Sequence, residues 1–343
     1  MKDTVFALDL AKSVFEVAVS QHPGRVSQQR RLTRSQLLRF MGKQSPSTVL
    51  MEACGSAHHW GREFGRLGHQ VRLLPAHDVA RYRQGNKTDA ADTRAILEAG
   101  RNEKIRAVPV KSIDQQALAA LHRLRSRWMA TRTARINGVR GILREFGLII
   151  PVGAAKVVPQ VRAWIGDSEA GLPSFLRPAL GEACDEIGEL ERKVGLVEAQ
   201  LEALGKQIDS VTRLRTIPGV GILTSTALVA LVGDVTRFPS GRSFASYLGL
   251  TPTERSSGSV RHLGHISKHG DVYLRTLLIH GARSTLCNAK RRENPDSLCR
   301  WALRLEKKRG HNVAAVGLAN RLARIVWAVW LRNQEYREMN RQG

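Results

Sequence analysis

The stretch TVFALDLAKSVFEVAVS, residues 4–20, decides the fold that we expect for the first third of the chain. β-Branched and aromatic residues dominate two runs in it, 4–10 and 14–20, and such runs are typical of β-strands. Strand and helix patterns then alternate. We expect strands at QQRRLT (28–33), STVLMEA (47–53) and QVRLLP (70–75), and helices at SQLLRFMGK (35–43) and AHHWGREFGRLG (57–68). This order predicts an α/β domain in which helices pack on a mixed sheet.

Four acidic residues stand out against this background. Asp9 lies on the first expected strand and Glu52 lies near the end of the fourth. A helix is predicted at KTDAADTRAILEAGR (87–101), where Asp89 and Asp92 are three residues apart and therefore share one face. Hard divalent cations prefer carboxylate ligands, and a two-metal site clamps both sides of a phosphodiester displacement. The alternative, in which Asp89 caps the helix and Asp92 is solvated, leaves the two strand acids unexplained, because buried acids are costly without a partner.

The charge of the chain points to a polyanionic partner. The 343 residues carry 54 Lys and Arg against 30 Asp and Glu, a formal net charge of +24. This excess suits nucleic acid better than a small-molecule substrate, although a generic basic surface is the alternative. Between 114 and 147 a long basic helix is predicted, in which seven arginines favour a phosphate track over a merely solvated face: Arg123, Arg125, Arg127, Arg132, Arg135, Arg140 and Arg144.

No segment predicts secretion or a membrane span. Charged residues interrupt the N-terminal stretch, which therefore does not resemble a signal peptide. The longest apolar run, 313–331, contains Arg321 and Arg324 and is typical of an amphipathic or buried helix. The four cysteines form no Cys-x-x-Cys pair. We expect a cytoplasmic protein.

The second half of the chain contains two helical signals, after a Gly- and Pro-rich region from Pro151 to Pro178 that predicts a linker. A heptad seam predicts a coiled coil whose partner is another protomer, with an intramolecular helical hairpin as the alternative. IPGVGILTSTALVALVGD (217–234) has a Gly-x-Gly turn that leads into a helix, the pattern of a helix-hairpin-helix. The seam residues are Ile187, Leu190, Val194, Val197, Leu201, Leu204, Ile208 and Val211.

Several motifs together resemble those of a known family. FALDLAK (6–12), LMEACGS (50–56) and KTDAADTRA (87–95) are similar, in order and spacing, to the D, E, D, D motifs of the DEDD transposases of insertion sequences. This family includes the Piv-type DNA invertases and the bridge-RNA-guided recombinases. IPGVGILTSTALVALVGD, FASYLGLTP (244–252) and SSGSVRHLGHISKHGDVYLRTLLIHGA (256–282) resemble its second half. Each motif is weak alone, and their joint order is specific.

The resemblance implies both a fold and a catalytic centre. It implies a RuvC-like (RNase H-type) domain at 1–150, a linker and coiled coil at 151–212, and a mainly α transposase domain at 213–343. Asp9, Glu52, Asp89 and Asp92 would bind Mg²⁺ or Mn²⁺. The family's nucleophilic serine in a Ser-Gly context maps to Ser257, directly before Gly258, with Ser256 as the runner-up. From the residues alone, SSG would be an ordinary turn.

The resemblance also implies partners and a reaction. We expect an RNA-guided recombinase that acts on target and donor DNA through a covalent phosphoserine and a Holliday junction. A structured non-coding guide (bridge) RNA would choose the sites. The protein would be a nucleoid-associated homo-oligomer, a dimer assembling to a tetramer, with each catalytic centre shared between protomers. Two alternatives stay open: a metal-dependent Holliday-junction resolvase-like nuclease without a covalent intermediate, and a non-catalytic nucleic-acid-binding protein.

Overall fold

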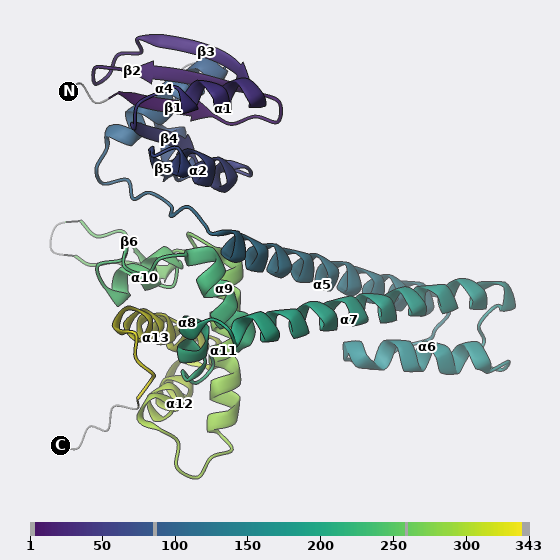
Figure 1. The fold of residues 1–343 in the computed structure, drawn as a ribbon. Coiled ribbons are helices and arrows are strands. Elements are labelled where there is room, and N and C mark those ends of the chain that lie inside the picture. Colours follow the sequence, from purple (N-terminus) through teal and green to yellow (C-terminus); the bar gives the residue numbers. More distant parts are fainter. Residues whose placement is uncertain (1–3, 85–87, 258–259, 338–343) are drawn as a thin grey trace. The chain divides into compact units, whose positions relative to one another are not determined.

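The computed structural model describes residues 4–84, 88–257 and 260–337, and the chain forms two compact units (Figure 1). The first unit comprises the residues up to Gln116 together with Val232–Arg237. The second unit comprises Ala117–Leu231 and the chain from Phe238 onward. Each unit is described below by itself.

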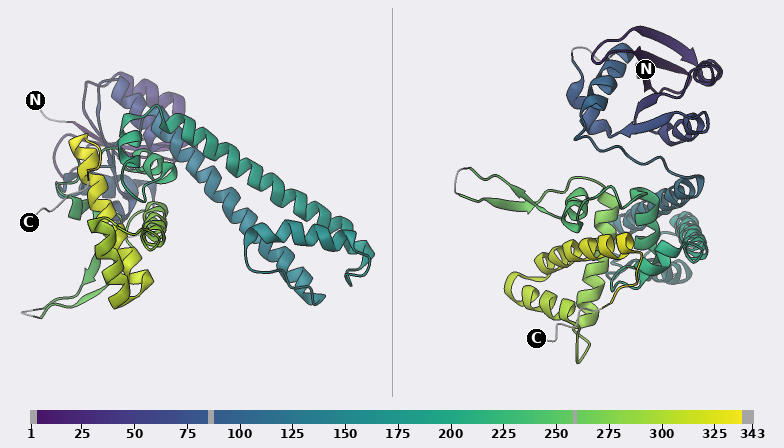
Figure 2. Two further views of the ribbon diagram at one scale, coloured as in Figure 1. Left: turned by 90° about the horizontal axis from the view of Figure 1, so that it is seen from below. Right: turned by 60° about the vertical axis from the view of Figure 1, so that its left-hand side comes forward.

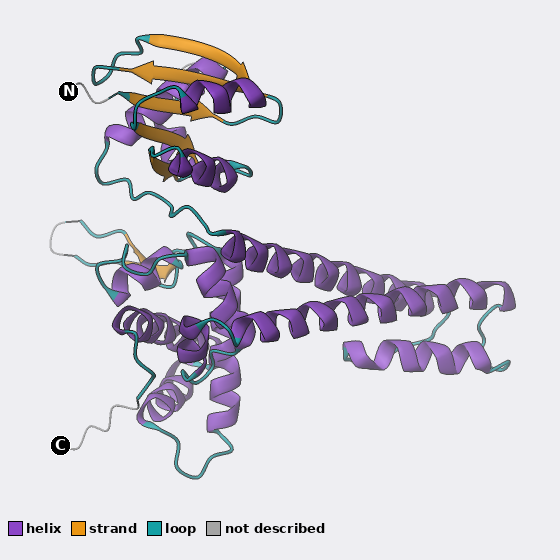
Figure 3. Cartoon of the chain, viewed as in Figure 1, coloured by secondary structure: helices purple, strands orange, loops and turns teal. Residues whose placement is uncertain are grey.

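A five-stranded sheet forms the centre of the first unit (Figure 3). Its order is β3-β2-β1-β4-β5, with β1, β2 and β3 antiparallel and with β4 and β5 parallel to β1. The mixed α/β sheet predicted from the sequence is therefore confirmed. The strands are β1 (Val5–Asp9), β2 (Val14–Ser20), β3 (Gln28–Thr33), β4 (Thr48–Glu52) and β5 (Gln70–Leu74).

Alternation along the strands builds two cores, one on each face of the sheet. Phe6 and Leu8 of β1 point to the face covered by α1 and α2, where Trp60 and Phe64 of α2 join the same core. The intervening Ala7 points to the face covered by α4. The helices of this unit are α1 (Arg34–Gly42), α2 (Ala57–Arg66), α3 (Ala76–Val79), the 3₁₀ helix η1 (Ala80–Tyr82) and α4 (Asp89–Arg101).

Helices dominate the second unit, in which a long arm extends from a helical body (Figures 1 and 2). The arm consists of α5 (Ile113–Glu145), whose first residues belong to the first unit, α6 (Val157–Gly166) and α7 (Arg177–Gly205), with short 3₁₀ helices at Ala154–Lys156 and Ser174–Leu176. The body contains α8 (Asp209–Arg215), α9 (Ile222–Val232), α10 (Gly241–Tyr247), β6 (Pro252–Glu254), β7 (Leu263–Ile266), α11 (Val272–Ala289), α12 (Ser297–Arg309) and α13 (His311–Arg332).

The heptad seam is covered inside the chain, and the prediction that another protomer covers it is wrong. Ile187 packs in one core with residues of α5 and α6, and Val197 and Leu201 pack in another with Leu118 and Ala119 of α5. Figures 1 and 2 show α5 and α7 side by side along the arm. A heptad pattern specifies that a neighbouring helix is present without specifying which chain supplies it. The intramolecular hairpin is therefore confirmed.

The helix that carries the heptad seam is also shorter than the sequence pattern predicted. The helix α7 ends at Gly205, so the last two predicted positions, Ile208 and Val211, lie beyond it. Leu204, the preceding seam position, is 40% exposed. The region predicted as a linker contains α6, whose Val157 and Val161 are buried in the core of the arm.

Most arginines of the predicted phosphate track bind elsewhere in the chain. Arg125, Arg132 and Arg135 of α5 form ion pairs with Glu198, Glu191 and Glu186 of α7. A fourth, Arg140, donates hydrogen bonds to the carbonyl oxygens of Ile150, Pro151 and Gly153. These bonds hold the arm together and engage the arginines within the chain. They weaken the prediction that α5 is a phosphate track.

One helix in the described part of the chain, α13, is long and apolar enough to cross a membrane. Eight of its residues are buried in the second unit, including Leu318 and Leu322. Its Arg321 guanidinium lies 3.6 Å from the centre of the Trp301 ring of α12. A core helix of a folded protein passes the same length and composition test, so α13 is weak support for a membrane span.

Candidate active site

The acids predicted from the two strands lie at the same edge of the sheet. Asp9 is the last residue of β1 and Glu52 is the last residue of β4. The two strands are parallel neighbours, and Leu8 of β1 lies opposite Met51 of β4. Each acid is the residue that follows this pair on its own strand. Alternation places them on the face of Ala7 and Leu50, which pack against α4. The sheet therefore directs both carboxylates toward the helix that carries the other two.

Asp89 and Asp92 occupy the first turn of α4. Thr88 is the N-cap, and its hydroxyl accepts a hydrogen bond from the Ala91 amide at 3.2 Å. Asp89 is therefore not the cap, and its side chain is 60% exposed. The Asp92 side chain is 14% exposed, so it is not simply solvated. Negative charge in the first turn is favoured by the helix dipole, which helps to offset the crowding of acids here.

The charges of three of the acids act on the fourth, Asp9, and the four together are named here the acid cluster. Burial raises the pKa of Asp9 most, and the negative charges of Asp92, Asp89 and Glu52 raise it further. Cys54 follows the same edge, where burial raises the pKa of its thiol and the charges of Glu52 and Asp9 add to the effect. A carboxylate whose neighbours are also carboxylates is destabilised as an anion, and a cation relieves this repulsion.

Two arginines that the sequence analysis missed pair with the helical acids. Arg83 Nε donates to Asp92 Oδ1, and Arg31 Nη2 donates to Asp89 Oδ2 at 3.1 Å. Arg31 lies on β3 opposite Glu16, and Glu16 lies on β2 opposite Asp9. This register could have been read from the strand pattern, because paired residues share a face. Arg83 follows η1 and has no comparable signal in the sequence.

The cluster fits a divalent cation by its donor chemistry. Four carboxylates offer hard oxygen ligands of the kind that Mg²⁺ and Mn²⁺ prefer. In the described residues, however, no three histidine, cysteine or acidic side chains are close enough to one another to hold a metal ion. Arg31 and Arg83 satisfy two of the four carboxylates in this arrangement. A cation would have to draw the four carboxylates closer together and replace the arginines as the partners of two of them.

Ser257 lies near the tip of the β6–β7 hairpin in the second unit, whereas the acid cluster lies in the first. It is exposed and forms an isolated bridge with Val260, whose amide donates to the Ser257 carbonyl at 3.2 Å. Gly258, which carries the Ser-Gly context, lies outside the described residues. The neighbouring Ser256 donates through Oγ to Glu254 Oε1 at 2.8 Å. Glu254 also binds Arg261, and hydrogen bonds from Ser256 and Arg261 lower its pKa.

The base of this hairpin is tightly packed. Gly249 and Gly270 both have positive φ, and a Cβ at Gly270 would lie 1.9 Å from the Tyr247 carbonyl oxygen. The side chain of Arg275 is buried and donates to the carbonyl oxygens of Leu248 and His269. The hairpin thus has an exposed tip on a base that is fixed by backbone contacts.

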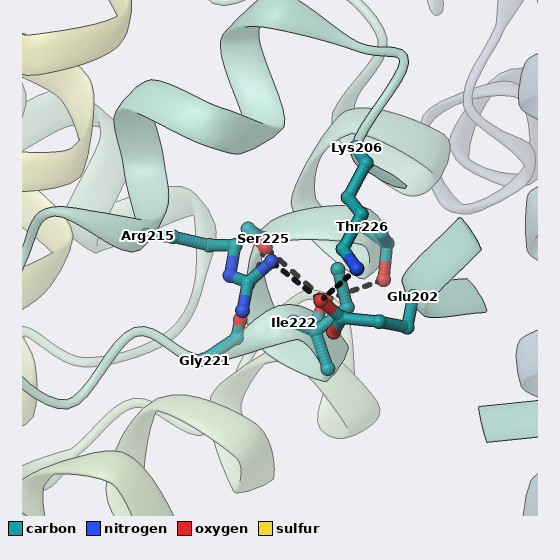
Figure 4. Close-up of polar contacts among 7 residues, drawn as sticks. All are labelled: Glu202, Lys206, Arg215, Gly221, Ile222, Ser225 and Thr226. Carbon is teal, nitrogen blue, oxygen red and sulfur yellow. Dashed lines mark hydrogen bonds and ion pairs between the residues drawn. The ribbon is translucent and has the colours of Figure 1, made fainter. Parts of the chain in front are cut away.

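The predicted helix-hairpin-helix segment consists of α8, a turn at 216–221 and α9. Figure 4 shows Glu202 of α7 between two cations, Arg215 at 2.8 Å and Lys206 at 3.9 Å, beside the first turn of α9. Gly219 of the turn has φ +83° and packs against the backbone of Gly281 in α11. The phosphate-binding role of this turn stays a prediction.

Comparison with known proteins gives consistent results. Residues 6–147 match a transposase family of the DEDD type from IS110 elements, and residues 211–296 match the family described as Transposase IS116/IS110/IS902. A probable family 20 transposase of Pseudomonas aeruginosa is 43% identical over 332 residues, which cover 96% of this chain and 97% of the relative. The transposase for insertion sequence element IS1111A of Coxiella burnetii is 37% identical and covers 98% and 92%. The transposase for insertion sequence element IS1328 of Yersinia enterocolitica is 33% identical over 95% and 96%.

Proposed function

Since the chain belongs to the IS116/IS110/IS902 family of transposases of insertion sequences, we propose that it cuts and rejoins DNA with the acid cluster and Ser257. The placement of four acids at the ends of β1 and β4 and in the first turn of α4 carries this proposal, together with the raised pKa of Asp9. The strand order β3-β2-β1-β4-β5, with acids ending β1 and β4, supports a RuvC-like (RNase H-type) domain.

Asp9, Glu52, Asp89 and Asp92 would hold the divalent cation, Mg²⁺ or Mn²⁺, which supplies Lewis-acid polarisation of the phosphate and offsets charge as it develops. Without the cation, Arg31 and Arg83 neutralise two of these carboxylates and keep them in place. Asp9 and Glu52 are fixed by the sheet, so they provide the rigid half of the site. Asp89 and Asp92 would exchange their arginine partners for the cation and so provide the adjustable half.

Ser257 would carry the covalent step. Its Oγ attacks the phosphorus, the Oγ–P bond forms and the P–O3′ bond breaks, which leaves a 5′-phosphoserine and a free 3′-hydroxyl. The serine proton passes to solvent, and a proton returns to the leaving 3′ oxygen. The 3′-hydroxyl of the incoming strand then attacks the phosphoserine and releases Ser257. The phosphoester energy is conserved throughout, so strand exchange through a Holliday junction needs no external energy source.

The partners in this proposal are target and donor DNA and a structured non-coding guide RNA. The net charge of +24 supports binding to nucleic acid, and an aromatic content of 5% with no recognisable base-reading module supports recognition by a guide. A homo-oligomer, a dimer assembling to a tetramer, would complete each centre with Ser257 of one protomer and the acids of another. Because α5 covers the heptad seam, a contact between protomers would involve other surfaces.

The test is to trap the covalent intermediate on an end-labelled, nicked target with the guide RNA and Mg²⁺ present. Denaturing electrophoresis should resolve a shifted, protease-sensitive band for the wild type. The band should be absent from Ser257→Ala and Asp92→Asn, and Ser256→Ala, the matched control, should retain it. All variants should bind RNA as the wild type does.

Each other outcome assigns a different chemistry. A band that persists in Ser257→Ala and is lost in Ser256→Ala would move the nucleophile by one residue. Metal-dependent cleavage without any attached protein would indicate the resolvase-like nuclease. Binding without cleavage in any divalent cation would indicate a non-catalytic protein.

A further inference from the structure

The first unit contains a large cavity that reaches the first turn of α4 at Thr88, Ala90 and Ala91 and is lined by none of the acid cluster. Its volume is about 1040 Å³, and all the residues that line it belong to this unit. Val5 and Thr48, the first residues of β1 and β4, form part of its wall, whereas Asp9 and Glu52 end the same strands. The cavity therefore reaches the opposite edge of the sheet from the acids. We name it the arginine groove.

One flank of α4 forms a long wall of the arginine groove. Ala91, Arg94, Leu97, Glu98 and Arg101 line it, and their spacing of three or four residues places them on one side of the helix. The opposite wall includes the turn between β2 and β3, in which Gly24 has φ +76° and lies against Arg101. The neighbouring Arg25 also lines the groove.

The lining of the arginine groove carries far more positive than negative charge. Glu98 is the single acid among the lining residues, and its partner is Arg101. Arg72 donates to the Gly100 carbonyl, and Arg81 lies 3.8 Å from Asp78. Arg25 and Arg94 are exposed, and among the described residues their side chains have no hydrogen bond or ion pair. The cationic residues of the lining are Arg25, Arg72, Arg81, Arg94 and Arg101, with His22 beside them.

We infer that the arginine groove binds the phosphodiester backbone of a single nucleic-acid strand. Unpaired guanidinium groups match phosphate in charge and in hydrogen-bonding geometry. The volume lies slightly above the usual range for ligand pockets, roughly 300–1000 Å³, which is a size suited to a segment of one strand. Val26, Leu97 and Tyr82 also line the groove and offer apolar contact to bases.

This inference does not depend on the proposed chemistry. The groove contains none of the acid cluster, and backbone binding needs no divalent cation. It can therefore be tested in EDTA, where cleavage is absent, and its failure would leave the proposal for Asp9 and Ser257 untouched.

The experiment measures binding of the full-length protein to short fluorescent oligonucleotides across a range of salt concentrations. Single-stranded DNA and RNA of the same sequence form the two arms. Arg25→Ala/Arg94→Ala removes the two unpaired cations. Arg39→Ala/Lys43→Ala removes the same charge from α1 and its C-cap, on the other face of the sheet, and is the matched control. Arg25→Lys/Arg94→Lys keeps the charge, and thermal unfolding checks that each variant is folded.

Loss of two phosphate contacts should reduce the slope of log K against log salt by about 1.4, since each contact with a single strand contributes about 0.7. The loss should be equal for different sequences, and the lysine pair should restore the slope. Oligonucleotides with a photoreactive thiobase should cross-link to peptides from 22–26 or 88–101. An effect confined to one arm identifies the strand as DNA or RNA, and an effect in both identifies a general strand site. An unchanged slope, or an equal change in the control, overturns the inference.

Discussion

The acid cluster and the β6–β7 hairpin that carries Ser257, named here the serine hairpin, both lie at the ends of strands. Their backbones are fixed in opposite ways. β1 and β4 have buried centres and neighbours on both sides, so Asp9 and Glu52 inherit their positions from the register of a five-stranded sheet. β6 and β7 form a two-stranded ribbon of mostly exposed residues. Such a ribbon has little stability of its own, so its base must position Ser257.

The difference determines what should damage each region. In the acid cluster the sheet fixes the backbone, so activity should be most sensitive to changes of side-chain charge. In the serine hairpin charge is screened by solvent, and the backbone contacts of Gly249, Gly270 and Arg275 are the sensitive property. Isosteric changes of charge should therefore silence the first region without unfolding it, and small changes of backbone should disturb the second.

The largest effect is expected from amide substitutions in the acid cluster. Asp9→Asn, Glu52→Gln, Asp89→Asn and Asp92→Asn should each reduce recombination by about a thousandfold or more, which corresponds to about 4 kcal/mol. Neutral amide oxygens lack the negative charge of carboxylates and therefore hold Mg²⁺ much more weakly. Recombination of a reporter substrate measures the loss. Glu103→Gln, an exposed acid of the same unit, should leave the rate unchanged, and a wild-type rate for Asp92→Asn would refute the site.

The second effect concerns the base of the hairpin. Gly270→Ala should destabilise the chain by about 3 kcal/mol, because the positive φ disfavours alanine and the new Cβ would overlap the Tyr247 carbonyl. Urea unfolding measures this loss. Gly55→Ala, near the acid cluster, is the control, since no atom lies within 4 Å of its ideal Cβ. Equal stabilities of the two variants would contradict the contrast between the regions.

The sequence predicted the two regions unequally for a physical reason. Alternation of period two places Asp9 and Glu52 on one face, so their convergence could be read from the strands alone. Arg83 could not be found in this way, because its pairing with Asp92 depends on how the chain folds back onto α4. The heptad seam was recognised, and its partner was misassigned for the same reason. Thr88 was passed over as the cap of α4 although threonine is a common N-cap residue.

A third effect comes from a buried histidine in the second unit. His122 of α5 is hydrogen-bonded to the hydroxyls of Tyr273 and Thr226, and burial together with the charge of Arg125 lowers its pKa from 6.5 to about 4. Its contribution to stability is complete above pH 6.5 and is lost as the pH falls toward 4, because only the unfolded chain takes up the proton in that range. The loss reaches about 3 kcal/mol at most.

Urea unfolding between pH 7 and pH 5 measures this loss. His122→Gln should flatten the pH dependence in that interval, and His280→Gln, an exposed histidine of α11, should not. If the wild type were equally stable at both pH values, a neutral His122 would be excluded.

The smallest effect has the opposite sign and belongs to the acid cluster. Burial and three neighbouring acids raise the pKa of Asp9 above 3.8, so the folded chain binds a proton more tightly than the unfolded chain does. The resulting stabilisation is complete below pH 3.8 and is lost as the pH rises through the folded pKa. At neutral pH the Asp9 anion therefore destabilises the first unit.

In EDTA, Asp9→Asn should raise the melting temperature at pH 7, by less at lower pH, and Glu103→Gln should not. Addition of Mg²⁺ should stabilise the wild type more than Asp9→Asn, because the variant has lost one of the four carboxylates that would hold the cation. If Mg²⁺ does not stabilise the wild type, the arginines keep their carboxylates. If Asp9→Asn is less stable than the wild type in EDTA, the four acids do not repel one another in the folded chain.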